Sequence, residues 1–391
     1  MSGLRIVILG ERFWPVVDPW ALAMEHLGGA LSDLGMQVTY VTCKWEKGWP
    51  DWFPVGAAQV RYVSAASRSL FVGQRPARQV QQMLESRANE IDALVISGSG
   101  EFLSVPLRIA RQRRTPCLVW IWTGHRLRNE AICDELSAIE WSAAASEPVR
   151  VVYEQADFAE RWIDRGLPSE LLVYAEPSIE LPRDVARLTR ASVRASLTQL
   201  DPRLRIAERQ QVCLVLGPIV DRDAWLRLLQ AWPHLQRHER GARLWLMGDG
   251  EGFAKLWEHA RRYQDQDAID FLGWFDDLDD VFEAVDLLIV PDRAPLEDRF
   301  ALRAMAVGLP VLALGPAERD GEAARFVHVA PAGAAGELAA EIASALQSGR
   351  RALRVTAAQN WVSLRRDMAV IAGQAERWIQ QLRAPQPQAG T

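Results

Sequence analysis

Cationic side chains gather around one short stretch of this sequence, and their type and spacing suit the binding of phosphate. Arg293, Arg299 and Arg303 lie on either side of Glu297, and a helix is predicted to begin at about Arg299. A guanidinium holds a phosphate bidentately, and the N–H groups and dipole of a helix N-terminus attract the same anion. We therefore expect a phosphate at the start of this helix. The backbone there belongs to Phe300, Ala301 and Leu302.

The elements around this stretch predict an open parallel sheet. Ile269–Leu272, Asp286–Val290 and Pro310–Leu314 are short apolar runs that are typical of strands, and helical patterns separate them. Helices between apolar strands indicate parallel crossovers. Ligands of such sheets bind in the crevice at the carboxyl ends of the strands. The loop at 291–298 leaves one of these ends, so the arginines are expected to lie in that crevice.

The same alternation extends over most of the 391 residues, which are too many for one ordinary core. We expect an α/β protein with two doubly wound Rossmann-like domains that face a central cleft, the default place for a ligand. One long helical pattern covers Trp361–Leu382 near the end of the chain. The expected parts are an N-terminal domain (1–180), a C-terminal domain (181–365), a helix packing back toward the N-terminal domain (366–383) and a disordered tail (384–391).

Composition excludes several classes of function. The chain is 49% apolar, and its net charge of −5 argues against nucleic-acid binding as the main task, although Arg108–Arg114 is locally basic. The four cysteines match no zinc spacing, so no metal site is predicted, and Cys43, Cys117 and Cys213 are expected to be small buried hydrophobes. No signal peptide or spanning helix is predicted. We expect a cytoplasmic protein, with at most a peripheral contact at the inner membrane face.

Two other motifs have open interpretations. Trp45, Trp49 and Trp52 sit in a stretch broken by glycine and proline. They form either an exposed stacking platform or a small hydrophobic core under a long loop. The turn at Ser97–Gly100 has the composition of a phosphate nest, although one glycine-containing turn alone is weak evidence.

Six short motifs follow one another in the second half of the chain. They are VCLVLGPIV at Val212–Val220, ARLWLMGDGEG at Ala242–Gly252, IDFLGW from Ile269, VDLLIVPD from Val285, RAMAVGLPVLAL at Arg303–Leu314 and VHVAPAG at Val327–Gly333. In this order they resemble the retaining GT-B glycosyltransferases of family 4, the glycosyl transferases group 1. RIVILGERFWP and LGMQVTYVT give the first half a weaker match, so the resemblance covers about residues 4–382. It implies a GT-B fold.

The glutamates of the family's donor site are only partly present. Family members carry two, of which the first contacts the donor sugar and the second, directly before an Ala-Met-Ala triplet, contacts the ribose hydroxyls. Here Arg303 precedes that triplet, Pro295 falls at the first position, and Glu297 is the nearest acid. An arginine only donates hydrogen bonds, so it does not replace a carboxylate toward ribose. It is suited to a phosphate instead.

The family's diphosphate-binding cations are also replaced. Its Gly-Arg-Leu turn appears here as Gly217–Ile219 without the arginine, and its Lys-Gly pair appears as Asp223–Ala224 beside Arg222. Each lost charge-assisted hydrogen bond is worth roughly 1.5–3 kcal/mol. Arg222 therefore joins the arginines near position 300 as a candidate phosphate-binding residue.

The resemblance suggests two catalytic candidates. His125 ends a first-domain strand, where family members often place a histidine near the sugar and the acceptor. Glu297 would accept hydrogen bonds from sugar hydroxyls. The plainer alternatives are a structural or exposed histidine and a solvated loop acid.

The nucleotide would contact two strand ends. In the family, the backbone at Leu272 and Gly273 faces the nucleobase, and Gly248, Asp249 and Gly250 would form the wall near the nucleotide. The alternatives are a plain strand end and a strand-to-helix turn that Asp249 caps.

By this resemblance, the chain would move a sugar from a nucleotide-sugar donor to a glycan, lipid or small-molecule acceptor, with retention, in glycan biosynthesis. The nucleotide-sugar would be a co-substrate, with no metal or other cofactor. The missing residues leave two alternatives open. One is a non-catalytic GT-B-like scaffold that binds a glycan or protein partner and whose arginines are neutralised by the chain's own carboxylates. The other is an enzyme with an unusual donor, such as a sugar phosphate or a lipid-linked sugar.

Overall fold

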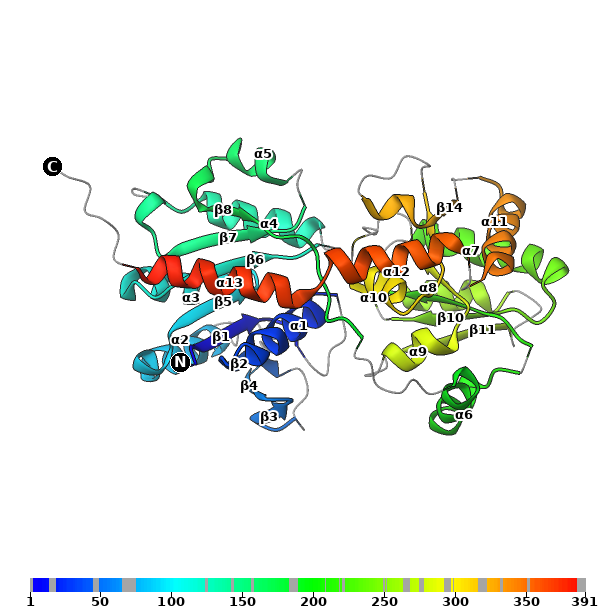
Figure 1. Ribbon diagram of the computed structural model, residues 1–391, viewed down its shortest axis with the longest axis horizontal. Coiled ribbons are helices and arrows are strands. Elements are labelled where there is room, and N and C mark those ends of the chain that lie inside the picture. The colour runs from blue at the N-terminus through cyan, green and yellow to red at the C-terminus, as the bar shows by residue number, and fades with distance from the viewer. Residues whose placement is uncertain are drawn as a thin grey trace. The chain divides into compact units, whose positions relative to one another are not determined.

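The chain forms two compact α/β units, each with its own parallel sheet (Figure 1). Unit 1 comprises Met1–Val16, Trp20–Glu180 and Asp367–Thr391, and unit 2 comprises Val17–Pro19 and Leu181–Arg366. The two Rossmann-like units confirm the predicted fold class. The computed structural model describes residues 3–13, 19–44, 49–64, 75–123, 126–141, 144–155, 158–182, 189–207, 209–217, 219, 222–248, 250, 252–262, 268–273, 278–291, 297, 299–315, 322–330, 333–349 and 352–384.

Unit 1 is built on an eight-stranded sheet of order β3-β4-β2-β1-β5-β6-β7-β8. Its neighbouring strands are parallel except β3 and β4, which pair antiparallel. The central strands β5 and β6 are buried at every position, as the continuous apolar runs predicted. The bounds are β1 (Arg5–Gly10), β2 (Gln37–Lys44), β3 (Trp52–Val55), β4 (Ala58–Ser64), β5 (Ala93–Ser97), β6 (Cys117–Ile121), β7 (Val149–Tyr153) and β8 (Leu172–Tyr174).

The described helices of unit 1 include one from the far end of the chain. They are α1 (Pro19–Asp33), α2 (Arg75–Ser86), α3 (Glu101–Arg113), α4 (Arg126–Ser137), α5 (Phe158–Ile163) and α13 (Met368–Arg383). α13 packs against β6 (Figure 1). Its buried residues, such as Ile371 and Ile379, belong to the core of unit 1, and Trp378 lies 6.3 Å from Trp120 between ring centroids. The C-terminal segment therefore completes the core of the first unit.

Unit 2 has a six-stranded sheet of order β11-β10-β9-β12-β13-β14, parallel throughout its described pairs. The strands are β9 (Val212–Leu216), β10 (Arg243–Met247), β11 (Ile269–Gly273), β12 (Leu287–Val290), β13 (Val311–Leu314) and β14 (His328–Ala330). The helices are α6 (Arg190–Leu200), α7 (Arg222–His238), α8 (Phe253–Ala260), α9 (Leu278–Ala284), α10 (Arg299–Ala306), α11 (Ala335–Ser348) and α12 (Leu353–Arg365). The strand order reverses between β9 and β12, which makes their carboxyl ends the switch point where ligands of such sheets bind.

The prediction of one long helix over Trp361–Leu382 is wrong, because α12 and α13 are separate helices. Asp367 ends the helical path: its carboxylate accepts a hydrogen bond from the backbone N–H of Ala369 at 2.9 Å and caps α13. The N–H of Met368 also donates to the carbonyl oxygen of Ile179 at 2.8 Å. The cap by Asp367 and the hydrogen bond to Ile179 thus interrupt the helix, although the helical pattern in the sequence is continuous.

The tryptophan-rich stretch contains a strand that the sequence did not reveal. β3 pairs antiparallel with β4, with Trp52 opposite Arg61. Trp49 packs on the core and meets the ring of Tyr62 edge-on at 5.5 Å, whereas Trp52 is 56% exposed. Trp45 lies outside the described residues. Trp49 therefore fits the interpretation of a small hydrophobic core, whereas Trp52 is exposed and its role as a stacking platform stays a prediction.

Candidate functional site

Glycines end or follow three strands at the carboxyl edge of the sheet of unit 2. The N–H of Gly217, after β9, donates to the carbonyl oxygen of Met247 at 3.1 Å, and the N–H of Gly248, after β10, donates to that of Gly273 at 3.1 Å. Gly217, Gly248 and Gly273 have φ values of 141°, 144° and 72°. Such conformations favour glycine, because other residues meet a clash at Cβ. The sequence therefore brings these strand ends into direct backbone contact.

The predicted nucleotide wall at Gly248 and Gly250 serves first to pack two loops together. A Cβ on Gly248 would overlap the carbonyl oxygen of Gly217, and one on Gly250 would lie 2.8 Å from that of Ile219. The N–H of Gly252 donates to the same Ile219 oxygen at 2.9 Å. These contacts support the alternative of a strand-to-helix turn, and a contact with nucleotide stays a prediction.

At the end of β11, the two predicted nucleobase contacts differ in exposure. Leu272 is 6% exposed, so its side chain belongs to the interior. Gly273 is partly exposed and its carbonyl oxygen accepts the hydrogen bond from Gly248. The predicted backbone contact with a nucleobase remains untested at both positions.

Arg303 forms a bidentate ion pair with Asp279. Its Nε lies 2.6 Å from Oδ1, and its Nη2 lies 2.5 Å from Oδ2 of the aspartate. The side chains are 15% and 39% exposed, so the aspartate forms the more solvent-facing half of the pair. Asp279 occupies the first turn of α9, where a carboxylate also complements the helix dipole. A carboxylate of the chain thus holds the guanidinium predicted to bind phosphate.

Glu297 is held by a second arginine. Nη2 of Arg366 lies 3.0 Å from Oε2 of Glu297, and the Arg366 side chain is only 4% exposed. The other carboxylate oxygen accepts from the backbone N–H of Ala323 at 3.4 Å. The guanidinium of Arg366 also lies 4.6 Å from the ring centroid of Trp361. Glu297 is therefore a structural counterion, and a contact with sugar hydroxyls would have to come in addition to this role.

The first residues of α10 turn their side chains into unit 2. Arg299 is fully buried, and Phe300, Ala301 and Leu302 are 3%, 0% and 0% exposed. Only the backbone of this turn is then placed to meet a ligand, as expected if its N–H groups hold a phosphate. The burial of Arg299 also makes its charge part of the interior of the unit and not of its surface.

Several predicted site residues lie outside the described part of the chain. His125, Asp249 and Arg293 are not described, and Arg222 is the first residue of α7 with a side chain that is not described either. Arg303, Glu297 and the first turn of α10 all lie in unit 2. His125 belongs to the sequence of unit 1.

The chain just before His125 is firmly anchored. Both the backbone N–H and the hydroxyl of Thr123 donate to Oε2 of Glu154, at 2.9 and 3.0 Å, and Trp120 donates to Oε1 at 3.3 Å. Asn129 in α4 donates to the carbonyl oxygen of Trp122 at 3.1 Å. Glu154 is 3% exposed, so it is a buried acceptor that fixes the end of β6. Sequence reasoning missed it, because nothing near it in the chain marks this role.

Carboxylates already occupy the turn at Ser97–Gly100. The backbone N–H and the hydroxyl of Ser99 donate to Oε1 of Glu11, at 2.8 and 2.7 Å. The N–H of Gly100 donates to both carboxylate oxygens of Glu135, at 2.8 and 3.0 Å. Carboxylates of the chain itself therefore accept the hydrogen bonds of this turn, and a phosphate at the turn stays a prediction.

Other predicted features concern metals, membranes and cysteines. Among the described residues, no three His, Cys, Asp or Glu side chains come together as metal ligands, and no helix has the length and hydropathy needed to span a membrane.

All four cysteines are free and buried, as predicted for Cys43, Cys117 and Cys213. Burial raises the pKa of the Cys43 thiol to about 12 and that of Cys117 still further. These thiols therefore stay protonated and unreactive near neutral pH.

The sequence did not reveal the ion-pair partners of Arg303 and Glu297. Arg366 falls within the long helical pattern predicted over Trp361–Leu382, and no role as an ion-pair partner was predicted for Asp279. Asp279 lies 24 positions from Arg303, and Arg366 lies 69 from Glu297. Local spacing carries no signal at such separations, although an acid-rich run that precedes a cation-rich helix offers a weak hint.

The comparisons with known proteins agree with this architecture. Residues 210–348, within unit 2, match the family described as Glycosyl transferases group 1. This confirms the resemblance that the motifs predicted. No curated protein sequence matches the chain.

Solved structures of low identity share the fold over nearly the whole chain. HepE of Anabaena, in complex with UDP-glucose, is 17% identical, covers 97% of this chain and 100% of its own, and has a TM-score of 0.68. WaaG, a glycosyltransferase involved in lipopolysaccharide biosynthesis, is 15% identical, with coverages of 97% and 100% and a TM-score of 0.65. A glycosyltransferase from Rickettsia africae is 12% identical, with coverages of 98% and 99% and a TM-score of 0.66. The fold is thus GT-B, the fold of these glycosyltransferases.

Proposed function

We propose that the chain is a retaining glycosyltransferase that moves a sugar from a nucleotide-sugar donor to a glycan, lipid or small-molecule acceptor. The observation that carries this proposal is the family match over residues 210–348, which includes the strand ends and the α10 helix of unit 2. Similar folds, such as HepE with UDP-glucose, hold nucleotide-sugars. The proposal places the protein in glycan biosynthesis, in the cytoplasm or at the inner face of a membrane.

The donor diphosphate would rest on the N-terminal backbone of α10. Transfer leaves a negative charge on the departing nucleotide, and positive groups held close to it lower the barrier. Arg303 is one such group, and Arg222 and Arg293 are candidates by sequence. Because a diphosphate carries more negative charge than one carboxylate, it competes with Asp279 for the guanidinium of Arg303. The partly exposed aspartate would then turn toward solvent.

This exchange makes a sharp prediction for Asp279→Asn. Removal of the carboxylate charge weakens the competition of Asp279 for the guanidinium of Arg303, so the affinity for UDP, GDP or ADP, whichever binds, should rise by about tenfold, which is about 1.4 kcal/mol. Arg303→Ala should lower the affinity by about tenfold or more, because a charge-assisted bond to phosphate is lost. Isothermal titration calorimetry measures both effects.

The matched control is Glu258→Asn, which removes the carboxylate of the surface pair with Arg262 in the same unit. Its affinity should equal that of the wild type. A fall in affinity for Asp279→Asn would contradict the exchange, since it would mean that the aspartate itself holds the ligand.

The pairs Arg303–Asp279 and Arg366–Glu297 favour a second candidate function. In a non-catalytic GT-B-like scaffold, we expect the arginines to be neutralised by carboxylates of the same chain. The predicted site residues Arg303 and Glu297 are each paired in this way, with Asp279 and Arg366. Such a protein would bind a glycan or protein partner without transfer. The two candidates separate in one assay: nucleotide-sugar hydrolysis that disappears in Arg303→Ala supports the enzyme, and no hydrolysis with any donor supports the scaffold.

The proposed reaction uses no metal ion, as the sequence suggested for a diphosphate held by cations and a helix terminus. Addition of EDTA should therefore leave the rate of transfer unchanged. A rate that falls with EDTA and returns with added Mg²⁺ would contradict this part of the proposal.

A further inference from the structure

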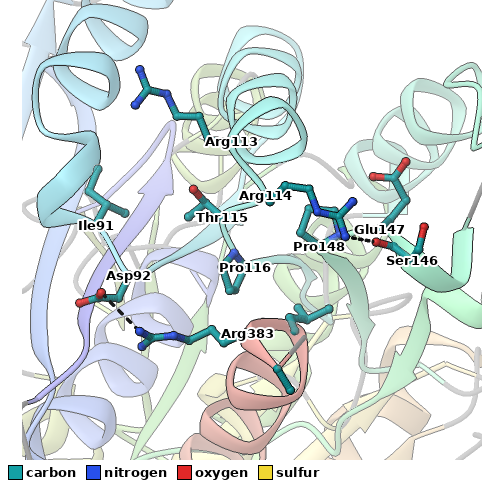
Figure 2. Close-up of a pocket in the computed structure, with 12 residues that line it drawn as sticks. Ile91, Asp92, Arg113, Arg114, Thr115, Pro116, Ser146, Glu147, Pro148 and Arg383 are labelled. Atoms are coloured by element: carbon teal, nitrogen blue, oxygen red, sulfur yellow. Dashed lines mark hydrogen bonds and ion pairs between the residues drawn. The ribbon is translucent and has the colours of Figure 1, made fainter. Parts of the chain in front are cut away.

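The helix α13 provides a fixed point where the chain passes from unit 2 back to unit 1, directly after Arg366. At its start, the N–H of Met368 donates to the carbonyl oxygen of Ile179 at 2.8 Å. At its end, Figure 2 shows the guanidinium of Arg383 pointing toward Asp92, with 3.8 Å between Nη2 and Oδ1. Its buried face belongs to the core of unit 1. Arg366 is therefore attached to a helix that unit 1 holds at both ends and along its buried face.

The helix α12, which ends with Arg366 as its C-cap, contacts α10 near both of its ends. Nε2 of Gln359 donates to the carbonyl oxygen of Ala306, the last residue of α10, at 3.0 Å. Nη2 of Arg366 lies 3.0 Å from Oε2 of Glu297, which precedes the start of α10 at Arg299. α12 therefore runs antiparallel along α10, and its contact with Glu297 lies next to the passage into unit 1.

The guanidinium of Arg366 is enclosed and therefore has a defined position. Its side chain is 4% exposed, and its Cζ lies 4.6 Å from the ring centroid of Trp361. Trp361 is held in turn, because its Nε1 donates to Oε2 of Glu322 at 3.0 Å. Apolar side chains of similar volume often stabilise such a position as well as a buried ion pair does. Stability alone thus does not account for the pair, whereas a set geometry between Arg366 and Glu297 does.

Glu297 keeps acceptor capacity beyond this pair. Its Oε1 accepts from the backbone N–H of Ala323 at 3.4 Å, and its Oε2 contacts Arg366. A carboxylate has about four lone-pair sites, so these two contacts leave capacity for hydroxyl donors of a ligand. The side chain is 18% exposed, which leaves part of it in reach of solvent. Arg366 therefore holds the carboxylate in place without occupying all of its acceptor sites.

We propose that Arg366 is a positioning residue for Glu297 and that α12 couples Glu297 to the point where the chain enters unit 1. The coupling is a property of the chain without ligand. Only the assignment of sugar hydroxyls to Glu297 rests on the proposed function. When the ion pair is broken, the guanidinium should turn toward water, and the backbone that joins Arg366 to α13 becomes easier to open. By linkage, a ligand that holds Glu297 in turn protects this backbone.

The first test measures amide hydrogen exchange of the full chain without ligand, which reports local opening. In Glu297→Gln, the N–H of Met368 should exchange about tenfold faster or more, because the carboxylate charge beside the buried guanidinium is removed. Gln359→Ala, which removes a neutral hydrogen bond at the other end of α10, should leave the rate at Met368 unchanged.

A core amide of unit 1 separates local from global opening in the same measurement. The N–H of Leu94 donates to the carbonyl oxygen of Pro116 at 2.8 Å, so its exchange reports opening of the sheet of unit 1. Its rate should be the same in the wild type and in both variants. An unchanged rate at Met368 in Glu297→Gln, or an equal rise at Leu94, overturns the coupling.

The second test uses calorimetry to separate positioning from a merely structural role. Arg366→Gln should weaken the binding of a nucleotide-sugar by about tenfold and leave the affinity of its nucleotide unchanged, because Glu297 is assigned to the sugar. Arg366→Lys keeps the charge but not the planar fork, so it should restore part of the loss. It also replaces Arg366→Gln in the comparison if that variant does not fold.

Equal weakening with the nucleotide-sugar and with the nucleotide overturns the positioning role. If the wild type binds neither ligand, the proposed function fails, and the exchange rates at Met368 and Leu94 alone decide the inference.

Discussion

Arg303 stands where the resemblance places a glutamate of the family, and the structure shows what an arginine does at this position. A carboxylate at this position would lie beside Asp279, and the two like charges would repel each other. The arginine instead forms two short bonds to Asp279, at 2.6 and 2.5 Å. Each of the two charges thus stabilises the other. If either Asp279 or Arg303 were removed, the remaining charge would be only partly in contact with water.

Glu297→Gln should destabilise the protein, because it removes the carboxylate charge that lies 3.0 Å from the buried guanidinium of Arg366. Breaking a buried pair by removal of one partner costs about 3 kcal/mol or more, and Arg366 is 4% exposed. Urea unfolding measures the change. The control is Glu258→Gln, whose partner Arg262 is largely exposed, and it should shift the free energy by less than about 1 kcal/mol. Equal effects of the two substitutions would contradict the structural role of Glu297.

His328 should make stability depend on pH. Burial, with a smaller contribution from Arg354, lowers the pKa of this imidazole in the folded chain. The unfolded state therefore binds the proton more tightly, and the free energy of unfolding should fall as the pH drops below about 6.5. His328→Gln should show a smaller loss between about pH 7.5 and pH 5.5 in urea titrations. An undiminished loss in the variant would assign the effect to other groups.

At the scale of elements, the strand ends of unit 2 are held together through their backbones. The turns after β9 and β10 contact each other so closely that a Cβ would not fit at Gly248 or Gly250, where it would meet the carbonyl oxygens of Gly217 and Ile219. This contact fixes the relative positions of the carboxyl ends of β9 and β10 through backbone packing alone.

Gly248→Ala should disrupt this contact. Its Cβ would overlap the carbonyl oxygen of Gly217, and φ at this position is 144°. Strain and overpacking each cost about 1–3 kcal/mol, so the unfolding midpoint should fall clearly. Gly217→Ala has nearly the same φ but no neighbour within 4 Å of the added Cβ, so it measures the backbone strain alone. Equal destabilisation by both substitutions would contradict the close packing of these loops.

The sequence predicts the strands well and the ion pairs poorly, for physical reasons. A strand buried on both faces must be an unbroken apolar run, as β5, β6 and β12 are. The break between α12 and α13 depends instead on Asp367 and on a hydrogen bond to Ile179 from a distant segment. The pairs of Arg303 and Glu297 likewise join distant positions, and single-sequence periodicity contains no information about them.

At the scale of the whole molecule, the chain consists of two α/β units. Residues 210–348 of the second unit match a glycosyltransferase family, and the fold of the whole chain is that of solved glycosyltransferases. The C-terminal helix α13 belongs to the core of unit 1, although the rest of the second half forms unit 2. The departures from the family motifs that the resemblance implies, such as Arg303, therefore leave the two-unit fold intact. Under the proposed function, they would change how a diphosphate is held.

The most direct test of the account is calorimetric titration of the full chain with UDP, GDP and ADP and with their sugars. The account predicts that at least one nucleotide binds, that its sugar binds as well, and that binding weakens by about tenfold or more in Arg303→Ala. Thermal unfolding should confirm the ligand, since a concentration about 100 times the dissociation constant stabilises the fold by about 2.7 kcal/mol. The absence of heat and of thermal stabilisation with every nucleotide and nucleotide-sugar would contradict the proposed transferase and leave the scaffold.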